Sequence, residues 1–125
     1  MRTKVIGQEL ITLKSVDSTN KHAAELLAQG KLAHGAVILA EEQTAGRGQR
    51  GRIWRSGSGL DLTASVLLHF EHLKASEQFV LAKIASLAVH DVVSSAMKVA
   101  VDRGSELTRI KWPNDVLVDR RKISG

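Results

Sequence analysis

The sequence predicts an α/β chain of the α+β kind, in which helices pack against a mixed sheet. Strand-length apolar segments occur before, between and after two helical stretches, which is the pattern of a sheet covered by helices. The apolar share of 43% is typical of a globular core, and the single proline among 125 residues leaves no visible linker. We therefore expect one domain over residues 1–125.

The first half of the chain is expected to hold a strand, a helix and two further strands. Asp17, Ser18, Thr19 and Asn20 supply capping side chains for the helix, and Gly30 stands where a C-terminal glycine belongs. The second strand is a continuous apolar run, which indicates burial on both faces. The elements are expected at residues 9–14 (strand), 21–29 (helix), 36–41 (strand) and 60–70 (strand).

The second half is expected to hold a long helix and a group of strands. Ser76 is a candidate cap for a helix that continues to about Val101 and is apolar over much of its girth, so we expect it to be largely buried. Strands are predicted at residues 107–112 and 116–119, joined by a turn at residues 113–115, and residues 122–125 begin another strand.

Composition and charge exclude several functional classes. The chain has 18 Lys plus Arg against 13 Asp plus Glu, a net charge of +5, which favours an anionic ligand without separating nucleic acid from nucleotide. The absence of cysteine excludes disulfides, thiolate metal sites and a cysteine nucleophile. We expect no metal-ligating set, because His69 and His72 are the only closely spaced histidines. No uninterrupted apolar run of membrane-spanning length and no secretory signal is visible, so a cytoplasmic chain without a membrane partner is expected.

The strongest chemical signal is a stretch rich in glycine and arginine at residues 46–52, followed by Trp54. Glycines let backbone N–H groups converge on an anion, arginines add donors matched to phosphate or carboxylate, and tryptophan offers a face for a ring. The spacing is neither that of a P-loop nor that of a dinucleotide-binding turn. We expect the whole of residues 43–59 to be a loop. Two alternatives are a disordered RNA-binding segment and a merely solvated basic loop.

Four segments in order resemble the biotin protein ligases. They are Asp17–Asn20, Glu42–Gly48, Lys111–Asp115 and Arg121–Gly125. The resemblance implies a fold related to the class II aminoacyl-tRNA synthetases and to the biotin and lipoate ligase catalytic domains. It also implies a two-step reaction: the biotin carboxylate attacks the α-phosphate of ATP, with Mg²⁺, and biotinyl-5′-AMP then acylates a lysine of a carboxyl carrier protein.

The resemblance also implies the roles of particular residues. The catalytic residues would be Lys122, Arg47 and Arg50. The biotin-binding residues would be Ser18, Thr19, Asn20, Gln43, Gly46, Arg47, Gly48, Gln49, Lys122 and Gly125, with Gln43 on the ureido group. The ATP-binding residues would be Arg50, Trp54, Lys111, Asn114 and Asp115, with Trp54 near the adenine.

Simpler interpretations stand beside these roles. Ser18 and Asn20 are also ordinary caps for the following helix, Asn114 with Asp115 is a common turn, and Lys122 lies in a basic run typical of a solvated surface. Alternative functions are a lipoate or octanoyl transferase of the same fold and a non-enzymatic nucleic-acid-binding module.

The chain also departs from the family pattern. The family loop usually has arginine where this chain has Gln49, and replacing an ionic hydrogen bond by a neutral one costs roughly 1 kcal/mol or more. The family catalytic domain continues beyond Gly125, so we expect a domain truncated on its C-terminal side. No winged helix precedes the catalytic motifs, so no DNA partner is expected. We do expect two copies of the chain to pair through an open strand edge.

Overall fold

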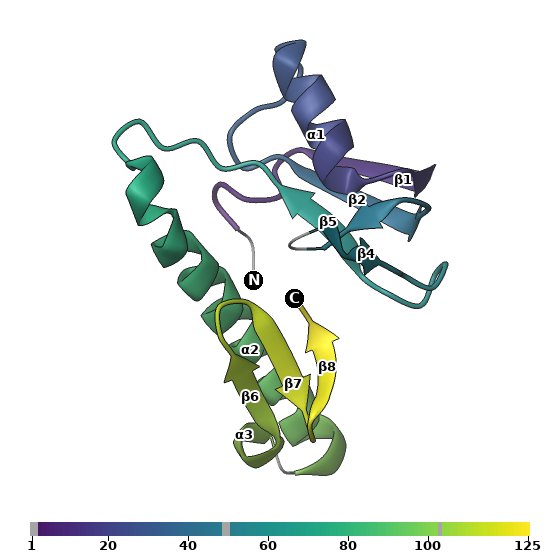
Figure 1. Cartoon of the computed structure of the whole chain (residues 1–125), viewed down its shortest axis with the longest axis vertical. Coiled ribbons are helices and arrows are strands. Elements are labelled where there is room, and N and C mark those ends of the chain that lie inside the picture. Colours follow the sequence, from purple (N-terminus) through teal and green to yellow (C-terminus); the bar gives the residue numbers. More distant parts are fainter. Residues whose placement is uncertain (1–2, 49–50, 103) are drawn as a thin grey trace. The chain divides into compact units, whose positions relative to one another are not determined.

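A computed structural model describes residues 3–48, 51–102 and 104–125 (Figure 1). The chain divides into two compact units, an N-terminal unit of Met1–Phe70 and a C-terminal unit of Glu71–Gly125. Each unit combines a sheet with a helix packed on it, so the predicted α+β fold is confirmed. Nothing in the composition marks the boundary between the units.

The N-terminal unit is built on a three-stranded mixed sheet. Strand β1 (Leu10–Val16) pairs in parallel with β2 (Val37–Gln43), and helix α1 (Thr19–Ala28) forms the connection between them. Strand β5 (Thr63–Val66) pairs antiparallel with β2, giving the strand order β1-β2-β5. Parallel pairing needs a crossover connection between the strands, and α1 supplies it here.

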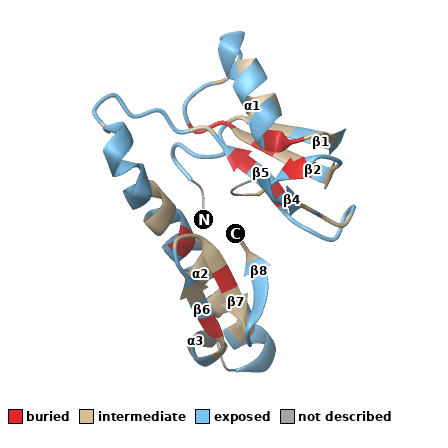
Figure 2. Cartoon of the chain, viewed as in Figure 1, coloured by how far each residue is buried: buried red, intermediate tan, exposed pale blue. Residues whose placement is uncertain are grey.

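The core of the N-terminal unit lies between α1 and the inner face of this sheet. Ile38 and Ala40 on β2 are buried, together with Thr63 and Ser65 on β5 (Figure 2). Alternate residues of β2 are less buried, so only one face of the strand is enclosed. The prediction of burial on both faces, made from the apolar run, is therefore wrong. The side chains of a strand alternate between the two faces, and α1 packs against one of them.

The glycine- and arginine-rich stretch is not wholly a loop, contrary to the expectation. Strand β3 (Gly46–Arg47) pairs antiparallel with β4 (Ile53–Trp54), and we call this pair the arginine ribbon. The Gly48 N–H donates to the Arg52 carbonyl at 2.7 Å and extends the ribbon by one bond. Glycine lets the two backbones approach closely here. The periodicity of the sequence does not reveal strands as short as these two.

The C-terminal unit packs one long helix on an antiparallel sheet. A turn of 3₁₀ helix (Ala75–Glu77) leads into α2 (Gln78–Val101), and the short α3 (Gly104–Leu107) follows. Strands β6 (Thr108–Lys111), β7 (Asp115–Val118) and β8 (Arg121–Ser124) form a meander in the order β6-β7-β8. Helix α2 contacts β6 and β7, and Val116 in the central strand is fully buried. The predicted helix, turn and strands are confirmed within a few residues, but Ser76 lies inside the 3₁₀ turn and is not the cap residue that we expect there.

Helix α2 is far more exposed than its apolar pattern predicts. Ser86 is its buried residue, whereas large apolar side chains such as Ile84, Val92 and Val99 are exposed (Figure 2). Within this unit the sheet covers one stripe of the helix, so the prediction of a largely buried helix is wrong. By length and composition alone, Ala75–Val101 is also apolar enough to cross a membrane. The helix contains no uninterrupted apolar run of that length, because Lys83 and Asp91 lie within it, but its mean hydropathy is high.

Candidate functional site

The N-terminal end of α1 is fixed by two local hydrogen bonds. Ser18 is the N-cap residue, with extended backbone angles (φ −156°, ψ 130°), and its Oγ accepts from the Lys21 N–H at 3.4 Å. The Asp17 carboxylate accepts from the Ser18 N–H at 2.8 Å. The capping interpretation is therefore confirmed for Ser18. It is wrong for Asn20, which lies inside the helix, and Asp17 binds the N–H of the cap residue rather than one of the helix.

An ion pair closes the same turn. Lys21 Nζ lies 2.6 Å from Asp17 Oδ2, and both side chains are exposed. The hydrogen bond from Lys21 lowers the pKa of the Asp17 carboxyl, and the same bond raises the pKa of Lys21. The pair neutralises the lysine locally, so it adds little net charge to the site.

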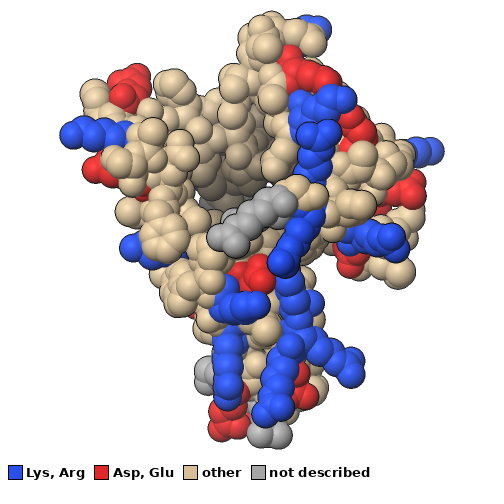
Figure 3. All heavy atoms as spheres, in the orientation of Figure 1, with Lys and Arg blue, Asp and Glu red and all other residues tan. Residues whose placement is uncertain are grey.

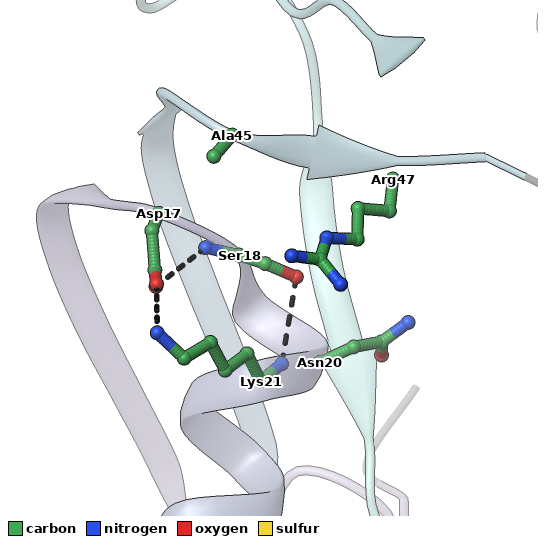
Figure 4. A pocket seen from close by; sticks show the side chains of 6 residues that line it. All are labelled: Asp17, Ser18, Asn20, Lys21, Ala45 and Arg47. Carbon is green, nitrogen blue, oxygen red and sulfur yellow. Dashed lines mark hydrogen bonds and ion pairs between the residues drawn. The ribbon is translucent and has the colours of Figure 1, made fainter. Parts of the chain in front are cut away.

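A pocket of about 300 Å³ opens at this end of the helix, a volume at the lower limit for small-molecule sites. Its lining combines the α1 turn with the start of the arginine ribbon: Asp17, Ser18, Asn20, Lys21, Ala45 and Arg47. Figure 4 shows the Arg47 side chain extending from β3 back toward Ser18 and Asn20. Since Lys21 is already paired, Arg47 supplies the net positive charge of the pocket, and the α1 N-terminus adds a partial positive charge. The pocket therefore favours an anionic or strongly polar ligand.

Beside the pocket, Thr19 binds the side chain of Gln43. The Thr19 N–H and hydroxyl both donate to Gln43 Oε1, at 2.8 and 3.0 Å. Gln43 ends β2 and stands opposite Val16 at the end of β1, so the parallel pairing brings it to the start of α1. The adjacent Gly46 is required by space, because a Cβ atom there would lie 2.9 Å from Gln43 Nε2 and 2.7 Å from the carbonyl oxygen of Trp54.

The C-terminal unit carries a second polar group near its chain end. Lys122 Nζ on β8 lies 2.8 Å from Asp115 Oδ1 at the start of β7. A Cβ atom on Gly125 would lie 2.6 Å from each of these two atoms, so glycine leaves room for the pair. Trp112 precedes this group and is 51% exposed, so it is not a core residue. Figure 3 shows basic side chains gathered on the visible face of this unit, over the region that holds β6 to β8.

The structure distributes the sequence-predicted residues between the two units. The N-terminal unit brings together Ser18, Thr19, Asn20, Gln43, Gly46 and Arg47 around the α1 turn, with Gly48 and Trp54 on the arginine ribbon. The C-terminal unit holds Lys111, Asn114, Asp115, Lys122 and Gly125 along the β6–β7 turn and β8. Gln49 and Arg50 lie outside the described residues.

Two serines near these groups were not singled out from the sequence. Ser65 on β5 contacts both Thr19 and Asn20, and Ser86 on α2 donates to the Pro113 carbonyl oxygen at 2.8 Å. Ser65 shares the inward face of β5 with the equally polar Thr63, and Ser86 is one of several serines on α2, so no local signal in the sequence distinguishes either residue. Among the described residues, no group of three or more His, Asp or Glu side chains could hold a metal ion.

The α+β chain thus places a cationic pocket at a helix N-terminus with the arginine ribbon beside it, which is the arrangement of a domain that binds an anionic or strongly polar small molecule. Residues 12–125 match the biotin/lipoate A/B protein ligase family, and the chain belongs to that family.

The chain is similar to curated members of this family. It is 41% identical over 113 residues to the biotin–[acetyl-CoA-carboxylase] ligase of Paracoccus denitrificans, covering 90% of this chain and 43% of that protein. It is 35% identical over 126 residues to the bifunctional ligase/repressor BirA of Bacillus spizizenii, covering 100% of this chain and 36% of the relative. The chain thus spans less than half the length of these relatives.

Solved structures agree with the sequence match. The biotin protein ligase of Leishmania major in complex with biotinyl-5-AMP is 31% identical, with a TM-score of 0.76, covering 92% of this chain and 49% of that chain. The biotin protein ligase of Aquifex aeolicus in complex with biotin and ATP is 34% identical, with a TM-score of 0.66, covering 92% of this chain and 44% of that chain. The expected biotin ligase type of fold is confirmed.

Proposed function

We propose that this chain is the biotin- and ATP-binding part of a biotin protein ligase that acts on a carboxyl carrier protein in the cytoplasm. The observation that carries the proposal is the meeting of two sequence motifs at one pocket, since Ser18 and Asn20 line it together with Arg47. Relatives and structural neighbours named as biotin ligases, two of them bound to biotinyl-5-AMP or to biotin and ATP, support the choice of substrate.

The proposed reaction has two balanced steps. A carboxylate oxygen of biotin attacks the α-phosphorus of ATP, an oxygen–phosphorus bond forms, and the bond to the β-phosphate breaks with release of pyrophosphate. The amine of the carrier lysine then attacks the acyl carbon of biotinyl-5′-AMP, an amide forms, and AMP leaves while the amine loses a proton. The first step brings two anions together, so cations must lower the repulsion between them.

The residues of the chain fit these demands. Arg47 offers a fork of donors at the pocket, and the Gln43 amide, held by Thr19, is placed to orient a polar ring. Lys122 would act on the carboxylate and phosphoryl oxygens, with Asp115 holding its ammonium group in place. Mg²⁺ is commonly bound through one or two carboxylates plus substrate phosphates. The described residues hold no cluster of three acidic or histidine ligands, which fits an ion that would enter with ATP rather than a protein cage.

Calorimetric titration tests the substrate class. Separate titrations of the full chain with biotin, with lipoate and with a short RNA should show heat of binding for biotin. Replacing Arg47 by Gln should weaken that binding about tenfold, because an ionic hydrogen bond becomes a neutral one. The matched control is Arg55→Gln, the same charge change at an exposed residue beyond the ribbon. Preferred binding of lipoate or RNA would contradict the proposal.

Substitution of Lys122 tests the chemical step. The Lys122→Ala variant should reduce biotinyl-5′-AMP formation at least 100-fold and leave biotin affinity within about threefold, because the charge matters most as negative charge grows on the α-phosphate. Pyrophosphate release measures the first quantity and calorimetry the second. An unchanged rate of pyrophosphate release would remove Lys122 from the mechanism.

A further inference from the structure

Ser65 links two of the proposed ligand-binding side chains. It lies on the inward face of β5, with 8% of its surface exposed, and its neighbour Thr19 at the start of α1 is 3% exposed. Its Oγ is 2.8 Å from Thr19 Oγ1 and 2.6 Å from Asn20 Oδ1. The contacts span about forty-five residues of sequence, so they join β5 to the N-terminal turn of α1.

These contacts continue into Gln43 and form one chain of polar atoms. Thr19 donates its hydroxyl proton to Gln43 Oε1 at 3.0 Å, and its N–H donates to the same oxygen at 2.8 Å. The single proton of Ser65 is therefore shared between Thr19 Oγ1 and Asn20 Oδ1. Two hydroxyl protons serve three contacts, so the two hydroxyls are coupled, and a turn of either one changes the contact that they share.

The hydrogen-bonded row of polar side chains, Gln43, Thr19, Ser65 and Asn20, reaches the pocket at Asn20. Asn20 lines the pocket and is exposed, whereas Ser65 is buried behind it and does not line it. An exposed amide side chain loses rotational freedom when a ligand fixes it, and a buried partner that holds it beforehand lowers that cost. Ser65 is thus suited to act on a ligand through Asn20 and Thr19 without touching it.

We propose that Ser65 is a positioning residue for ligand recognition, whose hydroxyl holds the Thr19 hydroxyl and the Asn20 amide in their binding directions. The inference rests on the proposed function in taking biotin as the ligand. Removal of the hydroxyl loosens Asn20 before any ligand arrives, whereas Gln43 keeps both of its donors from Thr19. The cost is then seen as weaker binding of the ligand.

The test compares Ser65→Ala with Thr63→Val in the full chain. Thr63 lies two residues earlier on the same buried face of β5, so its substitution removes a hydroxyl from the same strand while leaving the chain of contacts intact. Nitrogen-15 relaxation of the side-chain amides, measured without ligand, should show greater mobility of Asn20 in Ser65→Ala and no change in Thr63→Val. Biotin affinity should fall about 5- to 10-fold in Ser65→Ala alone.

A double-mutant cycle with Thr19→Val provides a second measurement. Because the two hydroxyls are coupled, the combined variant should lose less affinity than the product of the two single losses. Equal amide mobility in Ser65→Ala and Thr63→Val, or strictly multiplicative losses, would overturn the proposal and leave Ser65 as a packing residue. If the unaltered chain binds no biotin, the proposed function fails, and the amide mobility alone then decides the role of Ser65.

Discussion

Replacing Gly46 by Ala tests whether the close approach within the arginine ribbon is essential. The added Cβ would lie 2.7 Å from the Trp54 carbonyl oxygen, 2.9 Å from Gln43 Nε2 and 3.3 Å from Trp54 Cβ. The nearest atom belongs to the backbone of the paired strand, so it cannot swing aside as a flexible side chain would. The two strands must separate by several tenths of an ångström, and overpacking of this kind costs about 1–3 kcal/mol.

Thermal unfolding followed by circular dichroism measures this cost, and Gly48→Ala provides the control. A Cβ at Gly48 would meet the Arg52 carbonyl oxygen at 3.4 Å, an ordinary contact, so the same chemical change two residues away should alter stability by less than about 0.5 kcal/mol. The midpoint for Gly46→Ala should fall by roughly 4 °C or more, given the usual sensitivity of small domains. Equal midpoints for the two variants would refute the claim that Gly46 is required by space.

Two further predictions concern the polar contacts of the two units. Ser86→Ala should destabilise the C-terminal unit by about 1–2 kcal/mol in chemical denaturation, because the carbonyl that Ser86 binds in the β6–β7 turn loses its donor. Ser94→Ala on the same helix is the control and should be near neutral, since the Ser94 hydroxyl is buried without a partner among the described residues. Lys21→Met should raise the pKa of Asp17 toward its ordinary value in a carboxyl NMR titration, because the hydrogen bond that lowers it is lost. Since that pKa is lowered in the folded chain, the pair stabilises the fold above the unfolded pKa of the carboxyl and is lost as pH falls through the folded pKa. An unchanged Asp17 pKa would contradict the assigned pairing.

Local chemistry explains what could be predicted of the fold. The capping side chains before α1, the glycine after it and the turn before β7 act within a few residues, and these elements lie close to where the sequence places them. The exposure of α2 could not be predicted, because the sequence pattern of an apolar helix is the same whether its neighbours cover one stripe of its surface or all of it. The arginine ribbon is held by backbone pairing, and its two-residue strands are too short for a periodic signal.

The candidate site also has a part that could be predicted from the sequence and a part that could not. Motif residues such as Ser18, Gln43 and Arg47 were predicted by type and order, and the structure adds that the turn of α1 and the ribbon bring them together. Ser65 could not be predicted, because its role depends on pairing between β2 and β5, which no local pattern encodes. The roles assigned to Gln49 and Arg50 remain predictions, since both lie outside the described residues.

The parallel pairing of β1 and β2 has a consequence for how this chain can change in evolution. Gln43 reaches Thr19 because Val16 and Gln43 stand opposite each other at the ends of the two strands. A slip of one residue would turn the Gln43 side chain to the other face of the sheet, so an insertion inside either strand destroys the contact at once. Insertions between α1 and β2 over residues 29–34, before the buried Gly35 and Ala36, leave the register intact and should be tolerated. Length variation among functional descendants of this chain should therefore be concentrated in that connection and absent from the two strands.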